Sequence, residues 1–164
     1  MRLEFLKAGP ALLVEGDLCV LVAGDLHLGI ESDLSRHGLH IRSRSRERKE
    51  RLIACIEAAD PELFVLLGDV KHNVPLTSRQ EYRELPAILD AFRSKVPLRL
   101  LPGNHDPGIE KFFHDDEVLP KTGAVIDGVG YIHGHTCPDP SLQGHLIIAG
   151  HHHPMVSIRD EVGC

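Results

Sequence analysis

The sequence predicts an α/β protein, and three observations carry that prediction. Five short apolar runs each end abruptly in Gly, Asp, Asn or His, which is typical of buried strands. Helical patterns separate the early runs, and turn pairs separate the later ones. Strands therefore alternate with helices and then pass into hairpins, although alternation alone also permits an ordinary three-layer sheet. The five runs are residues 18–23, 63–67, 98–101, 129–132 and 145–149.

The chain has 164 residues, which suits a single domain with a real core, and we expect one domain over residues 1–164. Its formal net charge is −6. Bulk charge therefore argues against a protein that coats nucleic acid, because such proteins are basic overall. A local basic patch could still grip phosphates, so composition leaves nucleic acid open as a partner.

The N-terminal segment alternates charged with apolar residues from Met1 to Lys7, so it lacks the apolar stretch of a signal peptide. No run approaches the length of a membrane span. We therefore expect a cytoplasmic protein with no membrane partner. The cysteines are far apart in the chain and predict reduced thiols rather than a disulfide framework. They are Cys19, Cys55, Cys137 and Cys164.

The first two apolar runs, residues 11–15 and 18–23, flank Gly16-Asp17, a pair that favours a hairpin. The second run leads to Asp25 and His27. These two residues alternate across Leu26, so both side chains point to one face if the strand continues. Alone, the pair is a weak signal that favours a turn aspartate and a surface histidine over a site.

Residues 29–40 are expected to form a loop. The pattern from about Arg46 to Ala59 is helical, with Leu52 and Ile56 on one face and a Glu47–Arg51 pair one turn apart. This helix begins in the strongly basic stretch 42–51. The stretch is either a solvated helix face or a rim that grips substrate phosphates.

A strand over 63–67 leads into Gly68-Asp69. Ser78 and Glu81 then have the spacing of a capping box, and apolar residues from Tyr82 to Phe92 repeat at helical spacing. We expect both aromatic side chains in the core. Pro86 lies inside this helix and should kink or divide it.

The strand over 98–101 leads into Gly103-Asn104-His105-Asp106. A short helix and loop near the mouth of the site are expected over 107–123. Asp127-Gly128 then predicts a hairpin between 124–126 and 129–132. A loop over 138–144 should precede a last strand pair, 145–149 and 155–158.

Polar residues thus follow each of the five predicted strands. A ligand in an open α/β sheet usually sits at the carboxyl ends of such strands, so we expect the five ends to converge on one site. Asp, Asn and His together are the oxygen and nitrogen donors suited to Mn²⁺, Fe²⁺ or Zn²⁺, and the site lacks the thiolates of a structural zinc cage.

Taken together, these motifs resemble the signature of the calcineurin-like metallophosphoesterases, in order and along nearly the whole chain. Finer features are similar to an archaeal and bacterial branch of predicted phosphoesterases, which includes an endonuclease of the ligase-associated DNA damage response. The motifs are Asp25-Leu26-His27, Gly68-Asp69, Gly103-Asn104-His105-Asp106, His133-Gly134-His135 and Gly150-His151-His152-His153.

The resemblance implies a four-layer αββα sandwich and two divalent ions, with Mn²⁺ first and Fe²⁺, Zn²⁺ or Ni²⁺ as alternatives. It implies that Asp69 bridges the ions. It assigns Asp25, His27 and His153 to one ion, and Asn104, His133 and His151 to the other. By the same resemblance, His105 protonates the leaving group and Asp106 orients the His105 ring.

The clustered histidines leave alternatives. His135 competes with His133 as a ligand. Lys71 and His72 follow the bridging aspartate and could meet a substrate phosphate, although His72 also belongs to a set expected at the surface or in ordinary hydrogen bonds. That set is His37, His40, His72, His114 and His145.

The expected function is hydrolysis of phosphate mono- or diesters by a metal-activated water, with a small phosphoester or nucleic acid as the substrate. A non-catalytic interaction scaffold on the same fold is the alternative. The chain runs only from Pro154 to Cys164 after the last motif, whereas the family continues through further strands of its second sheet. An exposed sheet edge would then favour a homo-oligomer.

Overall fold

The computed structural model describes residues 1–154. Its first sheet has five strands in the order β1-β2-β3-β4-β5. β1, β2 and β3 pair antiparallel, and β3, β4 and β5 pair parallel. The strands are β1 (Arg2–Phe5), β2 (Leu12–Glu15), β3 (Cys19–Ala23), β4 (Leu63–Leu66) and β5 (Leu98–Leu100).

The hairpin predicted around Gly16-Asp17 is confirmed, with Glu15 opposite Cys19. β1 was not predicted. Its residues are mostly exposed, so it carries no buried apolar run, and it is held by pairing with β2, including an ion pair between Arg2 and Glu15.

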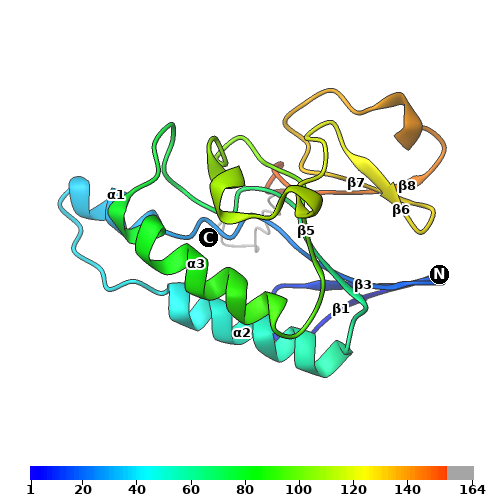
Figure 1. Ribbon diagram of the computed structural model, residues 1–164, viewed down its shortest axis with the longest axis horizontal. Coiled ribbons are helices and arrows are strands. Elements are labelled where there is room, and N and C mark those ends of the chain that lie inside the picture. Colours follow the sequence, from blue (N-terminus) through cyan, green and yellow to red (C-terminus); the bar gives the residue numbers. More distant parts are fainter. Residues whose placement is uncertain (155–164) are drawn as a thin grey trace, which may run out of the picture.

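Two long helices, α2 (Ser45–Ala59) and α3 (Arg79–Arg93), cover one face of this sheet (Figure 1). Their buried side chains, such as Leu52 and Phe92, join one core cluster with Phe64 of β4. The capping box of Ser78 and Glu81 is confirmed. Periodicity therefore placed the start of α2 within one residue, and the capping box located the start of α3.

Several expectations about the helical layer were wrong. Residues 30–36 form a helix, α1 (Ile30–Arg36), where we expected a loop, and acidic residues in its first turn and Arg36 in its last turn suit the helix dipole. Pro86 does not divide α3. Tyr82 is 54% exposed rather than in the core.

The second sheet has three strands, β6 (Ala124–Ile126), β7 (Val129–Ile132) and β8 (Leu146–Ala149). β6 and β7 form the predicted hairpin, and Asp127 and Gly128 both have the positive φ that a tight turn of this kind requires. β8 lies parallel to β7.

The two sheets pack face to face, because Val22 and Val65 of the first sheet share a core cluster with Val129 and Tyr131 of the second. Figure 1 shows the helices and the second sheet on opposite sides of the first sheet. Within residues 1–154 the layers are therefore helix, sheet, sheet. Among the described residues, the 3-10 turn η3 (Pro140–Leu142) packs on the outer face of the second sheet, over Gly130.

The stretch 107–123 contains two more 3-10 turns, η1 (Ile109–Phe112) and η2 (Asp115–Glu117). The strand expected over 155–158 and the thiol of Cys164 lie outside the described residues. None of the helices in residues 1–154 has the length and apolar character needed to span a bilayer.

Candidate metal centre

The predicted ligands come together at the carboxyl ends of β3, β4 and β5 in the first sheet and of β7 and β8 in the second. Backbone hydrogen bonds tie two of these ends directly. The N–H of Asp25 donates to the carbonyl of Gly68 at 3.0 Å, and the N–H of His27 donates to the carbonyl of Asp69 at 2.9 Å. Parallel pairing of β3 and β4 thus brings the first two motifs together.

One group of donors consists of Asp25, His27 and His153, whose ligand atoms all lie within 4.8 Å of one another. His153 Nε2 is 3.7 Å from Asp25 Oδ1. The side chain of His153 is 63% exposed, whereas that of Asp25 is 22% exposed. This half of the centre is open to solvent.

A second group consists of Asp69, His133 and His151, again within 4.8 Å of one another. His133 Nε2 is 3.4 Å from Asp69 Oδ1 and 3.2 Å from Asn104 Oδ1. Both Asp69 and His133 are buried. Asn104 therefore lies beside this group, and its assignment to the same ion as His133 and His151 stays a prediction.

The other ring nitrogen of His133 lies 2.8 Å from the carbonyl of Leu67. That carbonyl can only accept, so Nδ1 carries the proton in the neutral ring and the lone pair of Nε2 faces two oxygens. The three electron-rich atoms, His133 Nε2, Asp69 Oδ1 and Asn104 Oδ1, need a cation or a proton between them at these distances. Burial alone would lower the pKa of His133, but its bonds to Asp69 and Leu67 outweigh burial and raise the pKa.

Asp69 lies between the two groups. Its Oδ1 is 3.4 Å from His133 Nε2, and its Oδ2 is 3.9 Å from His27 Nε2. Burial would raise its pKa, but hydrogen bonds from His133 and from the backbone N–H of His105 outweigh burial and lower the pKa to about 2. Asp69 is therefore ionised at neutral pH and presents one oxygen to each group.

The backbone at these positions is unusual. Five predicted ligands have a positive φ, among seven non-glycine residues of the described chain that do so. Such conformations cost energy for residues other than glycine and tend to be kept at functional sites. The five ligands are Asp25, His27, Asp69, His151 and His153.

Two glycines make room for the buried group. A Cβ at Gly68 would overlap the His133 ring, and a Cβ at Gly103 would overlap the Asp69 carboxylate. The Gly that precedes Asp69 and the Gly that precedes Asn104 are thus required for close packing of the ligands.

The expected contact between Asp106 and His105 is wrong. Among the described residues, the Asp106 carboxylate accepts backbone N–H groups from Val70 (3.0 Å), Lys71 (3.2 Å) and Gly103 (2.8 Å) and forms no bond with His105. Burial raises the pKa of Asp106, and these donors oppose that effect. Asp106 therefore joins the ends of β4 and β5 and does not orient the His105 ring.

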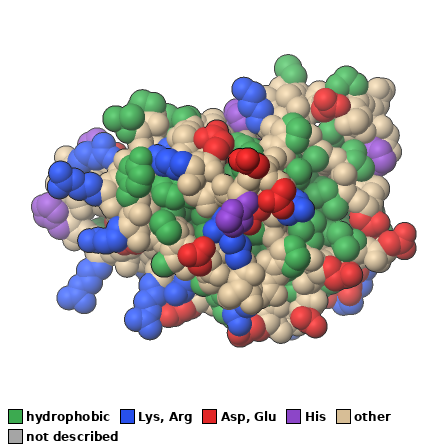
Figure 2. Space-filling model, in the orientation of Figure 1, with side chains coloured by type: hydrophobic (Ala, Val, Ile, Leu, Met, Phe, Trp, Pro, Cys, Tyr) green, Lys and Arg blue, Asp and Glu red, His purple; other side chains and the backbone are tan. Residues whose placement is uncertain are grey.

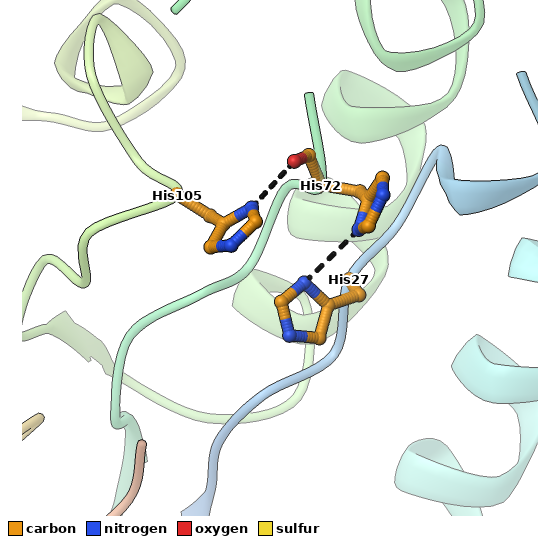
Figure 3. Close-up of side chains that lie close together, drawn as sticks. All are labelled: His27, His72 and His105. Carbon is orange, nitrogen blue, oxygen red and sulfur yellow. Dashed lines mark hydrogen bonds between the residues drawn. The ribbon is translucent and has the colours of Figure 1, made fainter. Parts of the chain in front are cut away.

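The His105 ring is instead oriented by a backbone carbonyl. His105 Nδ1 is 2.6 Å from the carbonyl oxygen of His72, and His72 Nδ1 is 3.3 Å from His27 Nδ1 (Figure 3). His27, His72 and His105 form a third group of donors within 4.8 Å. His72, which sequence reasoning placed mainly among surface histidines, thus lies inside the centre. Its position three residues after Asp69 was the available signal.

His135 does not join any of the three groups of donors in residues 1–154. Its ring centroid is 5.3 Å from that of His133, and its Nδ1 is buried without a hydrogen-bond partner. The observed contacts thus favour His133 over the alternative.

The chain is similar to known proteins in sequence and in fold. The sequence model of the calcineurin-like phosphoesterase family matches residues 19–135. A 50-residue segment is 46% identical to the mouse serine/threonine-protein phosphatase CPPED1, covering 29% of this chain and 16% of that protein. The chain thus aligns with about a sixth of the curated relative.

Two solved structures are also similar. A nuclease of Pseudomonas putida, named MPE, superposes with a TM-score of 0.58 at 22% identity, over 89% of this chain and 66% of that one. Yfce, a phosphoesterase from E. coli, superposes with a TM-score of 0.43 at 16% identity, over 71% of this chain and 57% of that one. The first likeness supports the fold described above.

Proposed function

Because this chain belongs to the calcineurin-like phosphoesterase family, we propose that it is a metal-dependent hydrolase of phosphate mono- or diesters. The observation that carries the proposal is the position of Asp69 between two groups of oxygen and nitrogen donors. That arrangement suits a pair of divalent ions, with Mn²⁺ as the first candidate and Fe²⁺, Zn²⁺ or Ni²⁺ as alternatives.

Each of the two groups of donors would supply the ligands of one ion. Asp69 would be shared by both ions. Bound ions of this kind supply Lewis-acid activation of water and of the phosphoryl oxygens. One ion would be held by Asp25, His27 and His153, and the other by Asn104, His133 and His151.

His105 completes the chemistry as the proton donor to the leaving oxygen. Its Nδ1–H is engaged by the carbonyl of His72, so Nε2 is the atom free to hold and deliver a proton. Its backbone N–H donates to Asp69 Oδ1 at 2.8 Å, which places the ring beside the shared carboxylate. Asp106 supports this geometry through the backbone of neighbouring loops.

The test is turnover of bis(4-nitrophenyl) phosphate by protein that has been stripped with a chelator and then supplied with Mn²⁺. Activity should require the metal and should fall by about 10²-fold or more in Asn104→Ala and His105→Ala. His40→Ala, in an exposed loop, is the matched control. Undiminished activity in the chelated sample would contradict the proposal, and absence of turnover both with and without Mn²⁺ would favour the non-catalytic scaffold.

Nucleic acid is the second candidate class of substrate, and the distribution of arginines bears on it. Figure 2 shows Lys and Arg side chains gathered toward the end of the molecule that carries α1. Arg36 and Arg79 line a hollow of about 460 Å³ together with Asn73, the residue next to His72. Arg48 and Arg51 line a second hollow with Asp25.

The basic stretch 42–51 supports a nucleic-acid substrate less than its composition indicates, because several of its arginines already pair with acidic side chains. Arg44 pairs with Glu47, Arg46 with Glu50, and Arg48 with the buried Glu31. A panel of single-stranded DNA, duplex DNA, mononucleotides and aryl phosphates decides the class. Selective loss of DNA cleavage in Arg36→Ala and Arg79→Ala, with aryl phosphate turnover retained, would support nucleic acid.

Three further expectations belong to this proposal. The finer fold would be the αββα sandwich, whose outer helical layer would cover the exposed Val125 and Ile147 on the outer face of the second sheet. The edge of β8 would favour self-association. The site of action would be the cytoplasm.

A further inference from the structure

Glu81 has contacts that its role as a helix cap does not require. In a capping box the glutamate side chain accepts the backbone N–H of the cap residue, here Ser78, and one carboxylate oxygen, Oε2, does so. The other oxygen, Oε1, turns away from the helix. It accepts the backbone N–H of His72 at 2.9 Å and that of Asn73 at 2.8 Å.

The carboxylate is committed to these contacts. Glu81 is 1% exposed, and the side-chain amide of Asn73 also donates to Oε1, at 3.0 Å. Gly29 lies directly over the Glu81 side chain, where a Cβ would overlap it. A buried carboxylate that accepts several N–H groups is a rigid anchor, because release of any partner would leave a charge without compensation.

The peptide unit between His72 and Asn73 connects this anchor to the candidate centre. The N–H and C=O of a trans peptide lie in one plane and point in opposite directions. Glu81 holds the N–H of Asn73, so the C=O of His72 points the other way, and there it accepts His105 Nδ1 at 2.6 Å (Figure 3). An N–H bound to a carboxylate also makes the carbonyl of the same peptide a stronger acceptor.

We propose that Glu81 is a positioning residue for His105, acting through the 72–73 peptide to hold the His105 ring with Nε2 toward the reacting phosphate. This role rests on the proposed function of His105 as proton donor. It is distinct from the capping of α3, because the two roles use different oxygens of one carboxylate.

The central variant is Glu81→Gln, which keeps the shape of the side chain but offers one acceptor oxygen where two are used. Ser78→Ala is the matched control. It removes the 3.2 Å bond from the Glu81 N–H to the Ser78 hydroxyl, and so weakens the cap, but leaves the contacts of Oε1 in place.

The first measurement compares kcat on two phosphodiesters, bis(4-nitrophenyl) phosphate and diphenyl phosphate. Nitrophenolate leaves without much help from an acid, whereas phenolate needs protonation. Glu81→Gln should lower kcat on diphenyl phosphate by about tenfold or more, and on the nitrophenyl ester by much less, with KM and bound metal unchanged. Ser78→Ala should affect both substrates equally and slightly.

A second measurement uses the background of His105→Ala. If Glu81 acts through His105, Glu81→Gln should cause no further loss of kcat there. A further loss in that background, or an equal loss on both substrates, would overturn the proposal. Should Glu81→Gln fail to fold, Glu81→Asp, which keeps the charge but withdraws it by one methylene, takes its place in every comparison.

The last measurement does not depend on catalysis. In metal-free protein, nitrogen NMR of the His105 ring should show a protonated Nδ1 that is protected from exchange in wild type and Ser78→Ala, but not in Glu81→Gln. An unchanged His105 signal in Glu81→Gln would overturn the proposal. If wild type hydrolyses neither ester, the proposed function fails, and this spectrum still decides whether Glu81 positions the ring.

Discussion

The two halves of the candidate metal centre use the same kinds of donor but differ in burial. His133 is fully buried and Asp69 is 2% exposed, whereas the side chain of His153 is 63% exposed. The buried donors follow β4 and β7, whose residues are largely buried, and His153 follows β8, which is mostly exposed. For these three donors burial matches the strand that each one follows, whereas His151, which also follows β8, is half-buried.

This difference implies different behaviour toward metal. Buried ligands are held by packing and by bonds such as that from His133 to Leu67, so they lose little freedom when an ion binds. On the exposed half, the side chain of His153 must lose conformational freedom each time an ion binds. We therefore expect the ion on the buried half to bind more tightly and to exchange more slowly.

The largest effect is expected from Asp69→Asn, which removes the charge that both halves share. Both ions should be lost from the purified protein, and kcat/KM on an aryl phosphodiester should fall by about 10³-fold or more. Metal analysis by mass spectrometry, together with turnover, checks this. Retention of two ions per chain would show that Asp69 does not bridge.

The asymmetry itself is tested by comparing His133→Ala with His153→Ala. Loss of an outer partner of a ligand already costs about 10- to 100-fold in metal affinity, so loss of His133 should cost at least that. His153→Ala should cost less, because water can take an exposed position. Calorimetric titration with Mn²⁺ measures both. Equal losses would remove the proposed difference between the halves.

The buried half should also be visible in the acid stability of metal-free protein. The pKa of Asp69 is lowered to about 2, so its contribution to stability is complete above about pH 4 and is lost as the pH falls through 2. The loss should be on the order of 2 kcal/mol. Urea unfolding at about pH 5 and about pH 2 measures this loss. In Asp69→Asn the free energy of unfolding should decrease less between the two pH values.

The smallest effect is expected from His135→Ala. This residue lies beside the buried half but outside its group of donors, so metal content and kcat should stay within about threefold of wild type. The same assays apply, with His133→Ala as the comparison. A loss as large as that of His133→Ala would reverse the assignment of the ligand on this strand.

Much of the fold could be predicted from local pattern. The apolar runs before Asp25, Asp69 and Asn104 are strands, and the capping box of Ser78 and Glu81 marks the start of α3, because period and capping depend on neighbouring residues. β1 was missed because an exposed edge strand has no apolar signature. α1 was missed because few of its seven residues are apolar.

For the site, the sequence by itself determined which donor types follow each strand, since every motif is a few residues long. Their pairing was decided by the tertiary structure. The division into a buried and an exposed half, the contacts of Asp106 with Val70 and Lys71, and the route from Glu81 to His105 all join segments that lie apart in the chain. Such contacts depend on how two sheets and the helical layer pack, and no local pattern encodes those distances.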